Sequence, residues 1–523
     1  MSRSRRLIGG LTFGYLRQGT VMLVGLWLTP FLLKHLGQHD YGLWLVGLQS
    51  LAYLVLMDFG VVALLPRDTA YATGRMVSET DGEALPTTIG RTARIVLWQT
   101  PVVAIAAAVV WFVVPMGAQV RGPVLLVLAG FTLLFPTRIF EATLHGLQEM
   151  AYLGKIQLFS WALSTALMVL FVLWGFGLYS LGIGWIAGQL LPPVLAFYRL
   201  RTSFPGVLPS HLPWLSMREI FRALGKGSWV SIAQIAQVLV AATDYLIIGK
   251  LLGAAAVVPY ACTGKLITVL GNQSHMIMEM AAPGLSEMKT GASRDRIFRA
   301  CSTLTLILLT AIGAIACVVL AVNHSFVNWW IGERQFGGLP LTCLFVANIL
   351  LRQWNNTSVY SIFALGYERR ISFTTLIDGA LSVGSGITLV HWIGPIGAPI
   401  GSILGVCLVS LPGNLLPLAR ELQVPVSKVV FSIWPWFWRF AIVSAICVAA
   451  GFRWQHGSFL YVAGIACAAA VLYCAVMIPM IMNSQVRAYL PLRVTQTWDG
   501  MIRRLNWANT AAVAEEVGAP KNS

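Results

Sequence analysis

The sequence predicts an all-α integral membrane protein of about 14 transmembrane helices. Three observations support this fold class: an apolar composition, a series of long hydrophobic segments, and an uneven placement of lysine and arginine. Of the 523 residues, 57% are hydrophobic and only 11% are charged, and the mean hydropathy is +0.74. A soluble domain is about 25% charged. The chain therefore lacks the polar surface of a cytosolic enzyme, a secreted domain or a disordered chain, and its formal charge of +16 does not indicate a nucleic-acid binder.

Each predicted span is an apolar run of roughly 20 residues, the length that crosses the hydrocarbon core of a bilayer. Glycine and proline inside several runs fit this interpretation, because membrane helices tolerate them better than soluble helices do. Short connections separate the runs, so no phosphate-binding loop or catalytic domain is expected between them. The predicted spans are 11–33, 43–65, 95–115, 123–144, 156–175, 180–198, 229–249, 256–278, 301–322, 339–365, 371–391, 395–418, 432–452 and 459–482.

Lysine and arginine test the number and order of these spans. With the N-terminus in the cytoplasm, the cytoplasmic segments hold 27 of the 36 basic residues and the opposite side holds five. This asymmetry is the positive-inside pattern, and it predicts that both termini are cytoplasmic. The five residues on the opposite side are Lys34, Arg121, Lys250, Arg334 and Arg453. Four more lie within or at the edges of spans: Arg17, Lys265, Arg352 and Arg439.

Internal repetition predicts how the spans are grouped. A shift of 216 residues places Lys34–Gly37 on Lys250–Gly253, so each half opens with a long helix, a K-x-L-G turn and a second helix. Parallel six-helix repeats imply a pseudo-two-fold axis along the membrane normal, with a site between the lobes. The predicted organisation is an N-terminal six-helix lobe (1–200), a cytoplasmic linker (201–226), a C-terminal six-helix lobe (227–420), two peripheral helices 13 and 14 (421–482) and a cytoplasmic tail (483–523).

Polar residues within the spans predict a hydrated central cavity. Such side chains are costly in a bilayer and usually face a protein interior or a wet cavity. A stripe at helical spacing follows the seventh span and consists of Ser231, Gln234, Gln237 and Asp244. A second stripe follows the eighth span and consists of Lys265, Thr268, Asn272, His275 and Glu279. Spans 1, 2, 10 and 11 add Arg17, Gln18, Asp58, Asn348, Arg352, Asn355, Thr374 and Asp378.

A structural role is the alternative for each of these residues taken singly. A buried salt bridge between Asp244 and Lys265 would only fix helix packing, and Arg17 or Arg439 would extend to the membrane interface. The two stripes together favour a cavity. No metal site or disulfide is expected, because the eight cysteines lie within apolar runs without a CxxC pair and the histidines are isolated.

Motifs around the first outward turn resemble those of a known family. They comprise Pro30, Leu36, Gly37, Tyr41 and Gly42, then Asp58 and Gly60, with the segment Ala282–Ser286 in the second half. On these residues the chain resembles the polysaccharide transporter family, the Wzx-type oligosaccharide flippases of the multidrug/oligosaccharidyl-lipid/polysaccharide superfamily. The resemblance implies a flippase that moves undecaprenyl-pyrophosphate-linked oligosaccharide across the bacterial inner membrane by alternating access. Its role would be surface polysaccharide biosynthesis: O-antigen of lipopolysaccharide, capsule or exopolysaccharide.

The candidate site residues fit the chemistry of such a substrate. Arginine offers fork geometry to phosphate and lysine offers a point charge, so Arg17, Lys265 and Arg352 are candidates for binding pyrophosphate. The amide side chains would meet sugar hydroxyls; they are Gln18, Gln234, Gln237, Asn272 and Asn348. No cofactor is expected. A carboxylate at membrane depth suits coupling to H⁺ or Na⁺, and the candidates are Asp58, Asp244 and Asp378.

Two other functions stay open at this stage. A cation-coupled drug or metabolite antiporter of the same superfamily would have a smaller, more acidic or apolar cavity and twelve helices. A membrane-embedded glycan polymerase or ligase would need a large outward loop, which the sequence does not predict. The expected partners are the lipid-linked oligosaccharide, membrane lipids, and polysaccharide polymerase and chain-length proteins, with no nucleic acid.

Overall fold

The computed structural model describes residues 3–77, 84–113, 118–271, 285, 293–364, 367–453 and 458–482. These residues form helices joined by turns, and none of them lies in a β-strand. A helix satisfies its backbone hydrogen bonds within one segment, which is the requirement for a chain that crosses lipid. The predicted all-α membrane fold is therefore confirmed.

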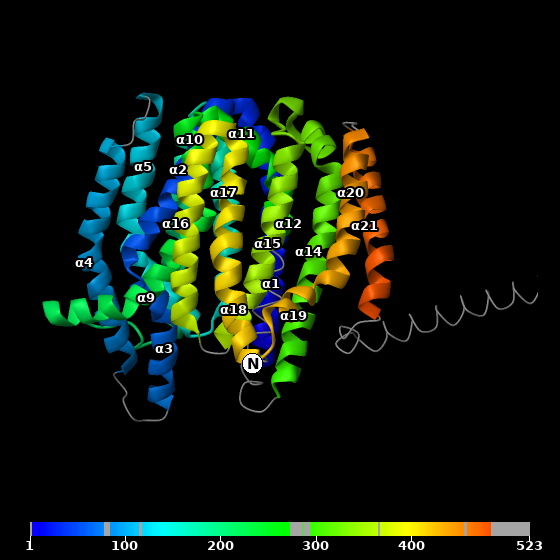
Figure 1. The fold of residues 1–523 in the computed structure, drawn as a ribbon. Helices are drawn as coiled ribbons and strands as arrows, with labels where there is room; N and C mark the ends of the chain where they lie inside the picture. The colour runs from blue at the N-terminus through cyan, green and yellow to red at the C-terminus, as the bar shows by residue number, and fades with distance from the viewer. Residues whose placement is uncertain are drawn as a thin grey trace, which may run out of the picture. The chain divides into compact units, whose positions relative to one another are not determined.

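The described part of the chain divides into two compact units (Figure 1). Unit 1 is Met1–Thr263, Trp330–Leu344 and Glu368–Ser410, and unit 2 is Gly264–Trp329, Phe345–Tyr367 and Leu411–Ser523. Unit 1 contains α1 (Arg3–Leu36), α2 (Gln38–Val55), η1 (Leu56–Asp58), α3 (Val61–Val77), α4 (Ala84–Val113), α5 (Ala118–Leu134), η2 (Phe135–Thr137), α6 (Arg138–Gly146), α7 (Met150–Leu173), α8 (Leu178–Ser203), α9 (Met217–Ala241), α10 (Asp244–Leu251), α11 (Ala254–Thr263), η4 (Glu333–Gln335), α16 (Glu368–Ile393), η5 (Gly394–Ile396), α17 (Gly397–Gly405) and the π-helix η6 (Val406–Ser410). Unit 2 contains α12 (Lys265–Gly271), most of α14 (Arg294–Ile331) and α15 (Leu339–Ala364), α18 (Leu411–Leu422), α19 (Val426–Phe431), α20 (Trp434–Arg453) and α21 (Phe459–Met482).

Ten helical stretches in the described ranges are long and apolar enough to cross a membrane. An eleventh follows if α9 and α10, which are bent by 50° at their junction, form one broken span. One of the ten, Arg370–Leu422, is 53 residues long. A straight helix of that length would measure about 80 Å, against a hydrocarbon core of about 30 Å. It must therefore fold back on itself. The total of 14 spans remains a prediction.

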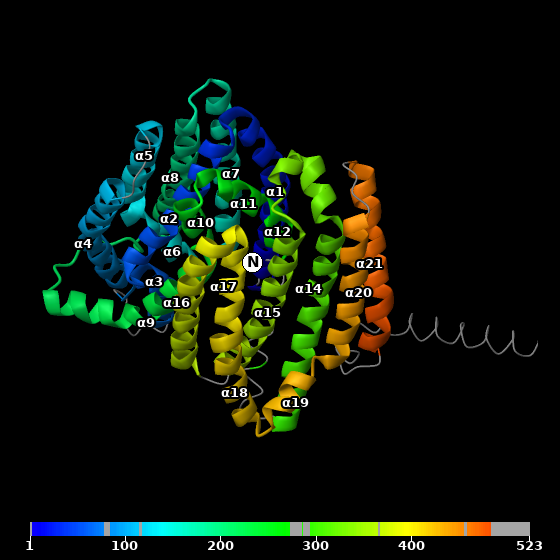
Figure 2. The same cartoon turned by 45° about the horizontal axis from the view of Figure 1, so that its top comes forward.

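The fold-back lies between α16 and α17, which run side by side (Figure 1 and Figure 2). Their backbones approach closely where glycines face each other. A Cβ atom added to Gly401 would lie 2.7 Å from the backbone nitrogen of Gly386. Small residues at a contact are the usual way in which membrane helices pack, because little hydrophobic effect acts between helices in lipid.

The two K-x-L-G turns of the predicted repeat have the same backbone conformation. Gly37 has φ +82° and Gly253 has φ +91°, values that glycine adopts without strain. The helices that follow these turns pack together within unit 1. A Cβ atom on Gly42 would lie 2.0 Å from the carbonyl oxygen of Ala254, and Gln38 Nε2 donates to the carbonyl of Ala255 at 2.8 Å. The glycines of the first motif thus serve turn formation and close packing.

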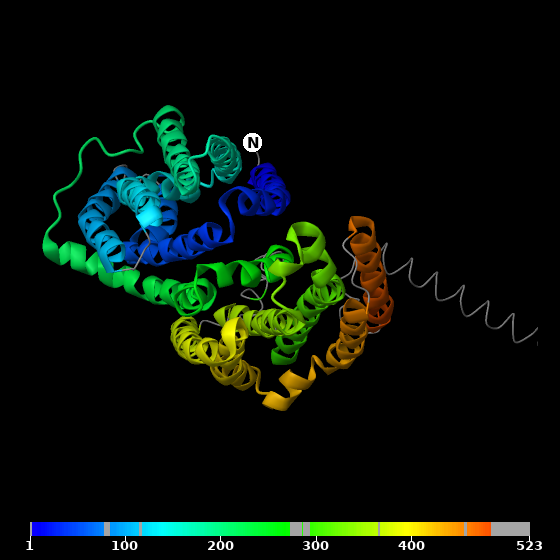
Figure 3. The ribbon, with the colours of Figure 1, turned by 90° about the horizontal axis from the view of Figure 1, so that it is seen from above.

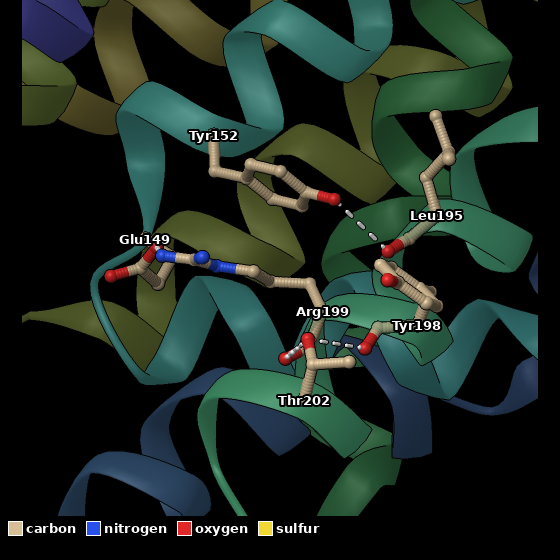
Figure 4. A network of polar contacts seen from close by, with 6 residues as sticks. All are labelled: Glu149, Tyr152, Leu195, Tyr198, Arg199 and Thr202. Carbon is tan, nitrogen blue, oxygen red and sulfur yellow. Dashed lines mark hydrogen bonds and ion pairs between the residues drawn. The ribbon is translucent and has the colours of Figure 1, made fainter.

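A network of polar contacts joins the start of α7 to the end of α8 (Figure 4). Arg199 Nη2 lies 3.1 Å from Glu149 Oε2, and the Arg199 guanidinium lies 5.0 Å from the centre of the Tyr152 ring. Tyr152 in turn donates its hydroxyl proton to the carbonyl of Leu195 at 3.2 Å. Arg199 therefore fixes the end of α8 against the start of α7.

In unit 2, the last two helices pack against each other and are drawn in orange in Figure 3. The buried hydroxyl of Tyr473 on α21 connects them to α14. It accepts a hydrogen bond from Trp436 Nε1 at 3.0 Å and donates one to the carbonyl of Thr310 at 2.9 Å. Gly313 makes room for the ring, because a Cβ there would meet the Tyr473 hydroxyl.

The ends of several helices differ from the predicted spans. The second span breaks at Phe59 and Gly60, both with positive φ, so α3 is a separate helix that extends to Val77. Helix α9 begins at Met217, within the predicted linker. Ser216 and Glu219 form a capping box there, with Ser216 Oγ accepting from the Glu219 N–H and Glu219 Oε2 accepting from the Ser216 N–H. Hydropathy marks the membrane-embedded part of a helix and misses these polar extensions.

Candidate functional site

The residues predicted to bind substrate are distributed over both units. Arg17 and Gln18 belong to α1, but their side chains lie outside the described residues, as does all of Asn272. Gln234 and Gln237 are on α9 in unit 1. Lys265 opens α12, and Asn348 and Arg352 are on α15, all in unit 2. Two pairs lie about one turn apart on a shared helix: Gln234 and Gln237 on α9, and Asn348 and Arg352 on α15.

On α15, Asn348 and Arg352 stand one helical turn apart and are both half-buried. The next residue of the predicted polar face, Asn355, is buried and accepts a hydrogen bond from Asn414 Nδ2 of α18 at 2.8 Å. Asn355 therefore contributes to packing, whereas the Arg352 side chain is only half-buried. On α9, Gln237 is exposed, and the buried Oε1 of Gln234 accepts no hydrogen bond from the described residues.

Asp58 lies at the centre of a buried cluster in unit 1. Its Oδ1 accepts from the N–H of Gly60 at 2.8 Å, and its backbone carbonyl accepts from Gln99 Nε2 at 2.9 Å. Its Oδ2 lies 3.5 Å from Arg138 Nη1, with the Asp58 side chain 1% exposed and the Arg138 side chain 33% exposed. The carboxylate thus stabilises the turn after η1 and has a cation beside it.

Asp244 begins α10, directly after the bend that follows α9. Its Oδ2 accepts a hydrogen bond from the Tyr260 hydroxyl of α11 at 2.5 Å. The Tyr245 ring meets the Tyr260 ring edge-on, with 5.9 Å between their centres. Gln49 of α2 accepts from the N–H of Tyr245 at 3.2 Å. The bend therefore places the Asp244 carboxylate within hydrogen-bond distance of the Tyr260 hydroxyl.

Asp378 of α16 is 1% exposed and is held by hydroxyl groups. Its Oδ1 accepts from Ser382 Oγ at 3.0 Å, and its Oδ2 accepts from Ser410 Oγ at 2.5 Å. Ser410 ends the π-helix η6, and Gly405 allows the close approach, since a Cβ there would collide with the Asp378 carboxylate. π-Helical turns occur often at functional sites.

We expect the Ser410→Ala variant to lower the stability of the protein by about 2 kcal/mol, because a buried carboxylate then loses a hydrogen-bond donor. The matched control is Ser385→Ala on α16, whose hydroxyl donates only to backbone carbonyls and whose loss should cost about 1 kcal/mol or less. Thermal unfolding of the detergent-solubilised full chain measures both. Equal shifts in melting temperature for the two variants would contradict the conclusion that the Ser410 hydroxyl stabilises the buried carboxylate of Asp378.

Three partners of the predicted acidic residues were not anticipated from the sequence: Arg138, Tyr260 and Ser410. Arg138 was assigned to the basic cytoplasmic set, and it is 80 positions from Asp58, so no local spacing connects them. Ser410 and Tyr260 lie in apolar runs and carry no charge. Among the described residues, no group of three or more His, Cys, Asp or Glu side chains could hold a metal ion.

The described helical stretches that are long and apolar enough to cross a membrane define a multi-pass α-helical membrane protein, and two of them carry the ion pair of Asp58 and Arg138. Residues 102–333 match the family model described as "Polysaccharide biosynthesis protein". The chain is 20% identical over 375 residues to "Uncharacterized membrane protein EpsK" of Bacillus subtilis (strain 168), covering 70% of this chain and 74% of that protein. These findings confirm the resemblance to a polysaccharide transporter family.

A solved structure shares the fold. "Lipid II flippase MurJ, inward closed conformation" has a TM-score of 0.60 at 10% identity, covering 90% of this chain and 100% of that one. The inward-facing conformation of a multidrug resistance MATE family transporter of the MOP superfamily has a TM-score of 0.49 at 15% identity, covering 76% of this chain and 94% of that one. The likeness to the first structure extends over nearly the whole chain, so helices of both units take part in the shared fold.

Proposed function

We propose that this protein is a flippase that moves undecaprenyl-pyrophosphate-linked oligosaccharide across the bacterial inner membrane for surface polysaccharide biosynthesis. The observation that carries the proposal is the match of residues 102–333 to a polysaccharide biosynthesis family, in a chain with ten described helical stretches that are long and apolar enough to cross a membrane. A polysaccharide pathway needs a membrane-embedded step that moves a large polar group attached to a lipid. This protein has the helices for that step and no expected catalytic domain.

The proposed mechanism is alternating access by rocking of the two predicted six-helix lobes, without making or breaking a covalent bond. Cationic side chains would bind the pyrophosphate at membrane depth, where water competes weakly. Arg352 is a candidate for this role because it lies within α15 one turn from Asn348, an amide suited to sugar hydroxyls. Arg17, Lys265, Gln18, Gln234, Gln237 and Asn272 remain candidates for the same cavity.

Ion coupling is a separate proposal, and the three carboxylates differ in their suitability. Asp58 already has Arg138 as a counter-ion. Asp244 and Asp378 accept hydrogen bonds from hydroxyl groups in the described structure, and hydroxyl and carboxylate oxygens are groups that also accommodate H⁺ or Na⁺. We therefore favour Asp244 and Asp378. Transport by Asp244→Asn and Asp378→Asn variants that responds to a collapsed ion gradient as the wild type does would contradict this proposal.

The experiment that tests the flippase proposal measures the pool of lipid-linked glycan in the host. Deletion of the gene should cause a complete undecaprenyl-linked repeat unit to accumulate, which mass spectrometry identifies. We expect wild-type protein to clear the pool, and Arg352→Gln to clear it at least tenfold more slowly, because a charge-assisted contact to phosphate is worth about 1.5–3 kcal/mol.

The matched control is Arg439→Gln on α20. The Arg439 guanidinium donates to the carbonyl of Pro435 at 2.5 Å and lies 4.3 Å from the centre of the Trp438 ring, so it is engaged by its own helix. This variant should clear the pool like the wild type. An unchanged pool in the deletion strain, together with altered drug sensitivity, would favour the drug or metabolite antiporter instead.

A further inference from the structure

A cavity of about 470 Å³ lies in unit 1. It is formed by the stretch of α3 from Val61 to Tyr71, the first turns of α4 and the start of α9, which runs crosswise to α3 and α4 in Figure 1. Its volume falls in the range of small-molecule sites. The charged and hydroxyl side chains of its lining are Arg67, Arg91, Arg222, Asp68, Glu219, Tyr71, Thr88 and Thr92.

The two carboxylates of the lining are already engaged. Asp68 lies 3.6 Å from Arg67 Nε. Glu219 Oε2 accepts from the backbone N–H of Ser216 at 2.8 Å and from its hydroxyl at 2.9 Å. These hydrogen bonds lower the pKa of Glu219, and the positive charges of Arg91 and Arg222 add to the effect. Arg91 and Arg222 form no ion pair with the described residues, and their side chains are exposed, so both guanidinium groups can reach a ligand.

Exposed apolar side chains adjoin the lining in sequence and form the rim: Tyr71, itself a lining residue, is 65% exposed, and the α9 residues Phe221 and Met217, next to lining residues along the chain, are 70% and 54% exposed. Trp214, which precedes α9, is 86% exposed and stacks with the Arg94 guanidinium at 4.9 Å. Aromatic and long apolar side chains beside arginines are typical of a helix that lies at the membrane–water interface.

The depth of the cavity agrees with that placement. Residues 95–113 of α4 are an apolar run that nearly suffices to cross the hydrocarbon core. Arg91 lies one helical turn before residue 95, so a run 95–113 that crosses the core would bring the Arg91 side chain to the level of the lipid phosphates. The rim would then meet acyl chains and glycerol, while the arginines would meet the phosphate.

We propose that this cavity binds the phosphate headgroup of an anionic membrane phospholipid through Arg91 and Arg222. Its occupancy would hold the start of α9 against α3 and α4. The phosphate of an anionic headgroup would pair with the guanidinium groups of Arg91 and Arg222. The exposed apolar rim would contact the acyl chains of the lipid, which a soluble phosphate lacks.

The test uses the full-length protein in detergent micelles, titrated with phosphatidylglycerol or with phosphatidylcholine of the same chains, and native mass spectrometry counts the bound lipid. We expect the wild type to retain phosphatidylglycerol preferentially. A cation near the headgroup is worth about fivefold in affinity, so the R91Q/R222Q double variant should bind it roughly 30-fold more weakly. The matched control is Arg218→Gln, an exposed arginine of the same helix outside the lining, which should change little.

A gain-of-binding variant separates the site from misfolding. Glu219→Gln removes a negative charge from the lining while glutamine can still complete the capping box, so affinity for phosphatidylglycerol should rise about fivefold. Equal retention of the two lipids by the wild type would overturn the proposal. So would equal losses in the double variant and in Arg218→Gln. Displacement of phosphatidylglycerol by inorganic phosphate would overturn it as well, because the cavity would then be a site for soluble anions.

Discussion

We expect the Gly60→Ala variant to accumulate far below wild-type levels in the membrane. Gly60 has φ +71°, a conformation that costs a residue with a Cβ about 1–2 kcal/mol. Its Cβ would also lie 2.6 Å from the carbonyl oxygen of Gly227 on α9. The facing position is equally closed, since a Cβ on Gly227 would lie 2.2 Å from the carbonyl of Phe59. Relief of these clashes would push the packed helices apart, which lowers the folding stability by a further ~1–3 kcal/mol.

The measurement is the abundance and the melting temperature of the variant, with Gly47→Ala on α2 as the matched control. A Cβ on Gly47 would meet nothing within 4 Å, so that variant should match the wild type. We expect Gly227→Ala to be as damaging as Gly60→Ala. Normal abundance and stability of the Gly60→Ala protein would show that the turn after η1 does not require close contact with α9.

We expect Arg138→Gln to destabilise the protein by about 3 kcal/mol, because it leaves the carboxylate of Asp58 buried without its counter-ion. Asp58→Asn should cost less, about 1 kcal/mol. Asparagine can still accept from the Gly60 N–H, and the Arg138 side chain is 33% exposed as a whole although its Nη1 is buried, whereas the Asp58 side chain is 1% exposed. The double variant R138Q/D58N should recover much of the loss, because neither charge is then buried alone.

Thermal unfolding of the four proteins in one detergent forms a double-mutant cycle that measures this coupling. Two results are diagnostic: which single variant loses more stability, and how much of that stability the double variant recovers. Additive effects, or a larger loss for Asp58→Asn than for Arg138→Gln, would contradict the ion pair as the reason that Asp58 is buried.

The helices of the fold could be predicted from hydropathy, because a bilayer selects long apolar runs and the predicted spans coincide with described helices over most of their lengths. The break between η1 and α3 was harder to predict from the sequence. The motif residues Asp58 and Gly60 were recognised, but their turn depends on a contact with Gly227, far along the chain. The bend between α9 and α10 also left no signal, because neither glycine nor proline stands at the junction.

The charged residues of the candidate site could be predicted from the sequence, but the side chains with which they interact could not. Mid-span carboxylates such as Asp58 and Asp378 stand out in an apolar sequence. Their partners are a distant arginine and serine hydroxyls, and only the tertiary fold brings Arg138 and Ser410 to them. The start of α9 was readable in principle, since Ser216 and Glu219 have the spacing of a capping box. The roles of Arg17, Lys265 and Arg352 in substrate binding stay predictions.

The most direct test of the flippase proposal is translocation by the purified protein in liposomes. Fluorescent undecaprenyl-pyrophosphate-linked oligosaccharide is placed in both leaflets, and a membrane-impermeant quencher reports the fraction that reaches the outer leaflet. The account predicts that wild-type protein exposes the inner-leaflet lipid to the quencher, that Arg439→Gln does the same, and that Arg352→Gln does so at least tenfold more slowly. A protected fraction identical to that of protein-free liposomes, with any applied ion gradient, would contradict it.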